Sequence, residues 1–531
     1  MQGKQQKIVI VGGGIGGLTA AAYLLHNGFR NIVIYEKNDR CGGLIDTFEY
    51  NGFFFDSGPR AFVNSGMIKP MLRNLGIDIE SINNKISIVI EDNVVTVDSM
   101  KSLEDYRNLL CKLFPNHIKD IDRIIKATKD LSKITQTLYE IDNPLFINIL
   151  KNKKFFFKKI LPWSFKFLFS LFKMKKNSVS MEKYLERLTD NKALIDIYSQ
   201  LFFKNTPSYF ALGYFYVYLD YFYPKGGTGQ LPNSIEQLII KNGASIQLNK
   251  EIKEVNIIDK TIVDTQGNHI YYDQLIWASD LKTFYNNINT RGLKKSYINR
   301  INKQSLKILE TGASESVYVM FLGVDLPAEY FYERGGAHLF YTPTKAGLGE
   351  IHKNRLYDLL NESSPNIEED IFSWLNDFCE MNTFEISIPN LRDKNLSPDN
   401  QSSVMVSCLF DYNLTQYIEK LELYDKFKEF MENKILNILD RNLYKGIYGK
   451  ILFKFSSTPL TIKKNCGSFN GSIVGWAFDG DSPVPDSILG IPKSPITPIK
   501  NVYQAGQWAY SPAGVPLAMF TGWYAAKKII K

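Results

Sequence analysis

The sequence contains little cysteine and little histidine. Its 531 residues include 5 cysteines, and no two of them form a CxxC pair. A sparse, odd-numbered set argues against a disulfide scaffold and against a zinc ribbon, and it fits a reducing compartment. Because the chain also has only 5 histidines, few ligands are available for a histidine-rich site, and we expect no bound metal.

The sequence also lacks a run that reads as a membrane span, which needs about 20 predominantly apolar residues. The best candidate, 209–223 (YFALGYFYVYLDYFY), is shorter and contains Asp220. A secretory signal is not recognisable, because the first apolar run leads straight into a glycine-rich loop. We therefore expect a cytoplasmic protein.

Acidic residues are missing from one segment, 151–176 (KNKKFFFKKILPWSFKFLFSLFKMKK). Its nine lysines account for the whole excess of 63 basic over 55 acidic residues. A nucleic-acid binder usually spreads basic residues among polar neighbours, so we expect no nucleic-acid partner. Lysine mixed with bulky apolar residues is typical of a membrane-surface element, and we predict peripheral contact of 151–176 with anionic lipids at the inner membrane face. The alternative is a solvated basic helix whose aromatic side chains pack on the core.

The first 36 residues predict a strand, a glycine-rich turn, a helix and a second strand. Ile8–Val11 and Ile32–Tyr35 are β-branched runs of the kind found in buried parallel strands. Residues 18–25 are rich in alanine and leucine, as in a helix, and Gly28 follows where a helix cap is expected. The turn between the first strand and the helix has the spacing GxGxxG.

Each part of this unit has a physical role in binding a dinucleotide. Gly12 permits the tight turn, Gly14 lets the backbone approach a pyrophosphate, and Gly17 allows close helix–strand packing. The pyrophosphate then lies at the positive end of the helix. Glu36, 19 residues after Gly17, can accept both ribose hydroxyls and would repel a 2′-phosphate, which disfavours NADP. The unit alone does not distinguish NAD from FAD.

The residues that follow make this distinction. A second glycine pair, Gly42-Gly43, precedes the stretch 52–62 (GFFFDSGPRAF). Here the sequence resembles the FAD-dependent family that includes phytoene desaturases, carotenoid isomerases and retinol saturases and, more distantly, the amine oxidases. In that family both stretches lie along the FAD, so the resemblance implies FAD as the cofactor. Residues 316–325 and 458–476 are similar to stretches of the retinol saturase and carotenoid isomerase branch.

Two later stretches agree with this resemblance. Residues 223–255 look like the family's central helix and the strand after it, whose Ile252 would touch the adenine. Residues 501–529 look like the closing flavin motif, in which a second helix N-terminus is aimed at the flavin. Gln507 stands where the family often has an acid, which keeps a hydrogen-bonding group but removes a charge. The resemblance and the motif together assign cofactor contacts to Gly12, Gly14, Ile15, Gly16, Gly17, Glu36, Lys37, Gly42, Gly43, Gly58, Pro59, Arg60, Ile252, Gly506, Gln507, Gly514, Val515 and Pro516.

The positions of these motifs predict an α/β fold, a Rossmann-like FAD-binding domain of the glutathione-reductase type with an inserted α+β substrate domain. The FAD-binding domain is expected to be discontinuous, and the substrate domain to fill the two insertions, the first of which contains the 151–176 segment. The predicted bounds are 1–80, 225–285 and 455–531 for the FAD-binding domain, and 81–224 and 286–454 for the substrate-binding domain.

The resemblance implies an FAD-dependent oxidoreductase that acts on C–C bonds of a hydrophobic, polyene or isoprenoid substrate. Desaturation, saturation and isomerisation all stay open, with hydride transfer expected at flavin N5. The chain shows no second dinucleotide fingerprint, so we expect oxygen, a quinone or a carrier protein as the electron partner. The loop 511–516 has no cysteine, so we predict non-covalent FAD. A flavin amine oxidase is the enzymatic alternative, and a prenyl-protein escort of the same fold that uses no flavin is the non-enzymatic one.

The substrate pocket is harder to predict than the cofactor site. The ring-rich stretch 209–223 could line a pocket for a conjugated chain, although such stretches more often form core. Weak candidates for catalysis are His338, Trp508 and Tyr510; a lone histidine is more often structural, and the other two flank the expected flavin loop. No catalytic residue is assigned from the sequence.

Overall fold

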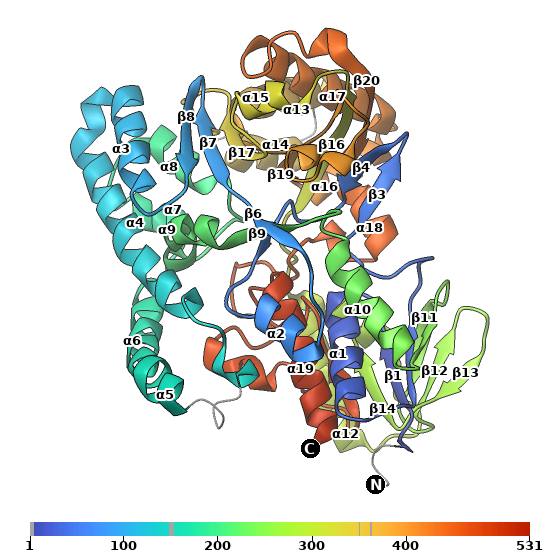
Figure 1. Cartoon of the computed structure of the whole chain (residues 1–531). Helices are drawn as coiled ribbons and strands as arrows, with labels where there is room; N and C mark the ends of the chain where they lie inside the picture. Colours follow the sequence, from blue (N-terminus) through green and yellow to red (C-terminus); the bar gives the residue numbers. More distant parts are fainter. Residues whose placement is uncertain (1–4, 148–152, 350, 362–363) are drawn as a thin grey trace.

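The computed structural model describes residues 5–147, 153–349, 351–361 and 364–531. Residues 151 and 152 of the predicted membrane segment therefore lie outside the described residues, as does the side chain of Lys153. The described chain forms two sheet layers, a parallel sheet near the termini and a larger mixed sheet above it (Figure 1). These two layers position the functional site described below.

A five-stranded sheet in the order β10-β2-β1-β14-β21 carries the N-terminal motif, and all four of its strand pairs are parallel. The first two predicted strands are confirmed with their bounds, and the predicted α/β class is confirmed as well. The strands are β1 (Ile8–Val11), β2 (Ile32–Tyr35), β10 (Ser245–Gln247), β14 (Gln274–Trp277) and β21 (Val502–Gln504).

Three helices stand together beside this sheet (Figure 1): α1 (Ile15–His26), α10 (Gln230–Lys241) and α19 (Val515–Ile530). Helix α1 begins three residues before the predicted start, because Gly16 and Gly17 belong to its first turn rather than to the loop. Because these two glycines have no side chain, the first turn of α1 can pack closely against neighbouring backbone. A Cβ on Gly16 would lie 2.6 Å from the Cα of Gly506, and one on Gly522 would lie 2.2 Å from the carbonyl oxygen of Gly16.

A smaller sheet and two helices complete this layer. Strands β11, β12 and β13 form an antiparallel meander and β15 pairs parallel to β11. A continuous apolar core joins this meander to β14 through Trp277, Val255 and Ile262. The elements are β11 (Ile252–Asn256), β12 (Thr261–Asp264), β13 (His269–Tyr271), β15 (Ile288–Asn289), α11 (Leu281–Asn286) and α12 (Lys295–Glu310).

The second layer is a seven-stranded sheet in the order β20-β16-β19-β18-β17-β7-β8. Both predicted insertions contribute to it, because β7 pairs parallel with β17 across 250 residues of chain. The strands are β7 (Ile86–Ile90), β8 (Asn93–Val97), β16 (Ser316–Val324), β17 (His338–Thr342), β18 (Phe384–Ser387), β19 (Ser402–Phe410) and β20 (Ile451–Ser457).

Helices cover one face of this sheet around a large apolar core that includes Trp374 and Phe427. The N-terminal hairpin of β3 (Thr47–Tyr50) and β4 (Phe53–Asp56) packs against the sheet through Phe55, Phe321 and Met405. The N-terminal segment therefore contacts both layers, and the domain bounds stay a prediction. The helices are α13 (Ala328–Tyr332), α14 (Leu356–Asn361), α15 (Ile367–Met381), α16 (Tyr412–Lys420), α17 (Tyr424–Arg441) and α18 (Pro459–Cys466).

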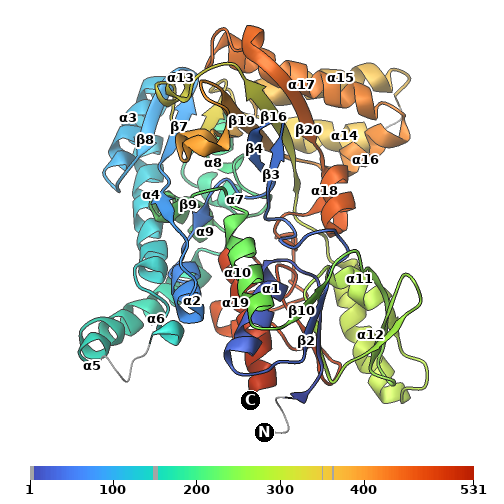
Figure 2. The ribbon, with the colours of Figure 1, turned by 45° about the vertical axis from the view of Figure 1, so that its right-hand side comes forward.

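A helical group lies along one side of both layers, and a three-stranded sheet in the order β5-β9-β6 lies between the layers. The helices of this group are α3 (Ser102–Leu113), α4 (Ile118–Tyr139), α5 (Lys153–Phe155), α6 (Leu161–Lys176), α7 (Met181–Leu185), α8 (Lys192–Ser199) and α9 (Ser208–Val217). The strands are β5 (Phe62–Val63), β6 (Ser81–Asn83) and β9 (Tyr221–Pro224). Helix α2 (Ile68–Leu75) packs in the apolar core that contains α1. Helix α6 stands at the periphery, as Figures 1 and 2 show. Within the described residues, no helix has the length and apolar character to cross a bilayer.

We expect Gly522→Ala to loosen the contact between α1 and α19. The new methyl group would overlap backbone that cannot move freely, and overpacking of this kind costs about 1–3 kcal/mol of unfolding free energy. Gly312→Ala is the matched control, because its Cβ would meet Ala477 at an ordinary 3.6 Å. A urea titration followed by circular dichroism measures both. Equal midpoints for the two variants would contradict the importance of this contact.

Candidate active site

One cavity of about 1520 Å³ lies between the two layers. It exceeds the roughly 300–1,000 Å³ of a usual single-ligand pocket, so it has room for two ligands side by side. One part, the cradle, is lined by the glycine-rich turn, by β2's end and by the start of α19. The other part, the aromatic half, is lined by α4, α6, α9 and one face of the seven-stranded sheet.

Two helix N-termini meet in the cradle. Gly14 precedes α1 and Gly514 precedes α19, and neither helix start receives a hydrogen bond from a capping side chain. A Cβ on Gly14 would meet no protein atom within 4 Å, and one on Gly514 only Pro516 at 3.9 Å. The backbone at both starts is therefore open to a ligand, and the positive ends of two helices favour an anionic one.

Glu36 lies at the end of β2 and is buried. Its Oε2 accepts a hydrogen bond from the Gly13 amide at 2.7 Å, and its Oε1 accepts one from the Asn38 amide at 3.0 Å. A carboxylate offers about four acceptor positions, so two stay available for the hydroxyls of a ribose. The cradle thus fits the pyrophosphate and the adenosine ribose of FAD.

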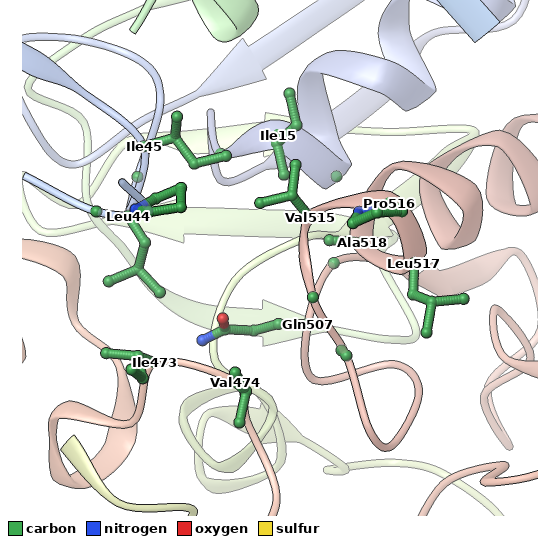
Figure 3. Close-up of a pocket in the computed structure, with 18 of the residues that line it drawn as sticks. Ile15, Leu44, Ile45, Ile473, Val474, Gln507, Val515, Pro516, Leu517 and Ala518 are labelled. Atoms are coloured by element: carbon green, nitrogen blue, oxygen red, sulfur yellow. The ribbon is translucent and has the colours of Figure 1, made fainter. Parts of the chain in front are cut away.

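The opposite end of the cradle is mostly apolar, with polar side chains that include Gln507 and Ser468. Figure 3 shows Gln507 pointing into the space between Leu44 and Ile473, close to Val474 and below Val515. Its amide lies 3.4 Å from the Ser468 hydroxyl. This setting suits a flat apolar ring system that carries a polar chain.

The structure brings seventeen of the eighteen predicted cofactor residues to this cavity. Gly17 is the exception: a Cβ there would lie 2.1 Å from the Gly12 carbonyl oxygen, so this glycine serves helix–strand packing and not ligand contact. Contact of the other residues with FAD stays a prediction.

Two cysteines are among the described residues that line the cavity, Cys41 and Cys466, and both are near Glu36. Burial raises the pKa of the Cys466 thiol to about 11 and raises that of Cys41 further. Both thiols lie on the ribose side, and non-covalent attachment of FAD stays a prediction.

Comparison with known proteins identifies the family. The sequence model described as flavin containing amine oxidoreductase matches residues 15–342, more than half of the chain. The chain belongs to this family. It is an FAD-dependent oxidoreductase, as predicted, and this finding removes the escort alternative.

Curated relatives and solved structures align with this chain over nearly its whole length. The flavin oxidoreductase is 22% identical to a 4,4′-diaponeurosporene oxygenase of Staphylococcus haemolyticus, covering 99% of this chain and 97% of the relative. It is also 22% identical to a 1-hydroxycarotenoid 3,4-desaturase of a Flavobacterium, covering 97% of each. An oxidoreductase from Methanosarcina mazei has a similar fold, with a TM-score of 0.59, 14% identity and coverage of 97% and 98%. Wild-type putrescine oxidase aligns with a TM-score of 0.57, 15% identity and 99% coverage of both chains.

The aromatic half of the flavin oxidoreductase's cavity includes part of the ring-rich stretch 209–223. Residues of this stretch divide between two roles, because Phe215, Phe222 and Tyr223 are buried in the core. The stretch therefore supplies both core and cavity wall. The rings that line the cavity are Tyr209, Phe210, Tyr214, Tyr218 and Tyr221.

Of the three weak catalytic candidates, Trp508 and Tyr510 line the cavity and His338 does not. Trp508 is buried against Trp476, with ring centroids 4.8 Å apart, and burial raises the pKa of Tyr510 well above its usual range. His338 lies behind Glu385, and its Nε2 is 2.9 Å from Glu385 Oε1. Glu385, which is not among the residues predicted from the sequence, does line the cavity.

We expect Gly14→Ala to weaken FAD binding about 10–100-fold while leaving the fold intact. The added methyl group meets no protein atom within 4 Å but projects into the cradle, and a steric overlap of about 1–3 kcal/mol corresponds to that loss of affinity. Gly449→Ala is the matched control, because it also adds a methyl group in open space, outside the cavity. Titration of the apoprotein with FAD, followed by flavin fluorescence, measures both. Equal affinities would show that the cradle holds no cofactor at Gly14.

Proposed function

We propose that the protein acts on C–C bonds of a hydrophobic polyene or isoprenoid substrate, by desaturation, saturation or isomerisation. The observation that supports this proposal is the continuity of the cavity: the cofactor cradle opens directly into the aromatic half. An extended conjugated chain would fill such a space and pack against its rings. The curated relatives, named as carotenoid oxygenases and desaturases, support the same substrate class.

FAD, when bound, supplies two-electron redox chemistry. The chain's own residues would hold it: Gly14 and Gly514 through their backbone, Glu36 through the ribose, and Gln507 beside the flavin. The aromatic half would exclude water and align the substrate. Oxygen, a quinone or a carrier protein remains the proposed electron partner.

A flavin amine oxidase is the second candidate. The family description and the fold of putrescine oxidase favour it. The carboxylate of Glu385 in the ring-lined wall of the cavity would also accept an amine with a long hydrocarbon tail.

We further propose that α6 lies on a membrane surface. Its outer side exposes large apolar side chains, with Phe165 69% and Phe172 74% exposed. Exposed lysines accompany them, while Trp163 and Phe167 on the inner side line the cavity. Trp163 anchors the helix by donating a hydrogen bond to the Thr137 carbonyl oxygen at 2.6 Å. A lipophilic substrate could thus pass from the bilayer along α6 into the cavity, and the protein would be peripheral at the inner membrane face.

The redox proposal is tested with the purified protein and an acyclic polyene. We expect a two-banded yellow spectrum whose FAD is released by heat, and anaerobic bleaching of that band by 4,4′-diaponeurosporene dispersed in detergent. Reoxidation of the reduced protein by the same polyene would instead indicate saturation. Release of hydrogen peroxide with long-chain amines, without any response to polyenes, would contradict the proposal and favour the amine oxidase.

The membrane proposal is tested by co-sedimentation with vesicles of phosphatidylglycerol and of phosphatidylcholine. Changing Lys166, Lys173 and Lys176, exposed lysines of α6, to Glu should weaken binding to the anionic vesicles about 100-fold or more, because each lysine near such a surface contributes about 1 kcal/mol. The control changes three lysines at α12 to Glu: Lys294, which precedes the helix, and Lys295 and Lys303 within it. Binding that survives the first set of changes, or is lost equally with the control, would exclude α6 as the contact.

A further inference from the structure

Arg60 and Glu385 both line the cavity, and Glu385 does so from the seven-stranded sheet, in the wall of the aromatic half. A third of the side-chain surface of Glu385, 33%, is exposed, and that exposure faces the cavity. A charge in an apolar cavity costs folding free energy unless it is paired and hydrogen-bonded. The structure shows how this charge is maintained.

The seven-stranded sheet places Glu385 in a row of residues that all face the cavity. Phe340 on β17 is directly opposite Glu385 on β18, which is opposite Ser407 on β19. The row continues to Val319 on β16 and Ser457 on β20. All five residues line the cavity. The carboxylate therefore comes from a rigid strand in the middle of the wall.

A chain of hydrogen bonds behind the wall fixes the carboxylate. Arg392 Nη1 donates to Asn84 Oδ1 at 2.9 Å, which turns Asn84 Nδ2 toward His338 Nδ1, also at 2.9 Å. Since Nδ1 accepts that bond, the proton of the neutral imidazole is on Nε2, which donates to Glu385 Oε1 at 2.9 Å. Ser407 Oγ lies 3.3 Å from Glu385 Oε2.

The charges around Glu385 keep it ionised. Burial would raise its pKa, but the hydrogen bond from His338 and the charge of Arg60 lower it below the ordinary value of 4.5. Burial lowers the pKa of His338, so that the imidazole stays neutral. Arg60 and Arg392 are both buried, and with the carboxylates of Asp56 and Glu385 they form a balanced cluster.

The remaining titratable groups near the carboxylate are phenols. Burial raises the pKa of Tyr214 to about 12 and raises those of Tyr218 and Tyr221 further, so all three are neutral. The rings of Tyr221 and Phe340 also flank His338, with centroid distances of 5.9 and 5.6 Å. The cavity therefore presents an ionised carboxylate with weak basicity inside a ring-lined space.

We propose that Glu385 is the catalytic base of a desaturation, a proposal that rests on the polyene function proposed above. A C–C single bond becomes a double bond when one carbon loses a hydride equivalent to FAD, the two-electron oxidant, and its neighbour loses a proton. The electron pair of the second C–H bond becomes the π bond, and the proton goes to Glu385. A weak base is sufficient, because loss of a hydride makes the neighbouring C–H strongly acidic.

The hydrogen bonds of Glu385 favour one direction of the reaction. Its two oxygens face the donors His338 Nε2 and Ser407 Oγ, so the group is arranged to accept a proton, whereas saturation would require a protonated group that donates one. This arrangement favours desaturation over saturation. His338 is a positioning residue, which orients the carboxylate and keeps its pKa low.

Glu385→Gln should lower polyene turnover about 100-fold to 10 000-fold, the usual contribution of general acid–base catalysis, with FAD content unchanged and a lower thermal midpoint, because Arg60 and Arg392 lose a compensating charge. Glu385→Asp should recover part of the loss. The control is Glu380→Gln, which removes a carboxylate paired with Lys434 and Arg441 outside the cavity. Unchanged turnover in Glu385→Gln would overturn the proposal.

The pH dependence of activity distinguishes a positioning role of His338 from a merely structural one. Activity needs the carboxylate, so it is lost as pH falls through the pKa of Glu385, below 4.5 in the wild type. His338→Phe removes a hydrogen-bond donor to that carboxylate and so raises its pKa. The pH at which activity is lost on the acid side should therefore rise by about one unit. An acid limb that does not move would overturn the role of His338.

A binding measurement distinguishes failure of the proposed polyene function from failure of the proposed role of Glu385, because binding needs no turnover. Protonated N,N-dimethyldodecylamine carries a cation on an apolar chain, and calorimetry should show at least 10-fold tighter binding to the wild type than to Glu385→Gln. Dodecanol should bind both equally. If no polyene is oxidised but this difference is present, the polyene function fails while the carboxylate still faces the ligand. If the amine itself is oxidised with peroxide release, or binds both proteins equally, the role of Glu385 as a base is overturned.

Discussion

Helices α1 and α19, almost a full chain length apart in sequence, touch backbone to backbone, and the rest of the architecture depends on that contact. Gly16, Gly506 and Gly522 leave no side chain between them, so the two helices start side by side at the same edge of the parallel sheet. Because both N-termini are uncapped by side chains, the contact brings two positive helix ends to one cradle. A larger residue at Gly16 or Gly522 would overlap backbone and separate the two halves of the cofactor site.

The second layer depends on a buried group of charges. Arg392 donates to the Arg60 carbonyl oxygen, to Asn84 and to Ser387, and its guanidinium lies 3.8 Å from the ring of Tyr223. These partners come from the loop after β4, from the segment before β7 and from β18. The same group that joins the two layers therefore also holds the carboxylate of Glu385 against the cavity. Removing one member would leave an uncompensated charge, which costs more than the pair contributes.

The N-terminal unit could be predicted closely because its signals are local. Strand, turn, helix and acid follow one another within 36 residues, and the bounds of β1 and β2 agree with the prediction. The stretch 209–223 could not be assigned to core or cavity, since its period does not say which side of α9 meets empty space. Glu385 was missed although it leaves a signal: it is the only charged residue in the strand Phe384–Ser387. A single acid in a buried strand is ambiguous until its partners, His338 and Ser407, are known.

The sequence by itself determined the cofactor class and the parallel sheet, because glycine spacing, β-branched runs and the acid at the end of β2 act over short distances. It also determined that lysines and large apolar residues share the segment that became α6. Only the tertiary structure decided that the inner side of α6 lines the cavity and that His338 stands behind Glu385. Each of these depends on contacts between segments far apart in the chain. Such contacts follow from how sheets and helices pack in three dimensions, and the order of residues along the chain does not encode them locally.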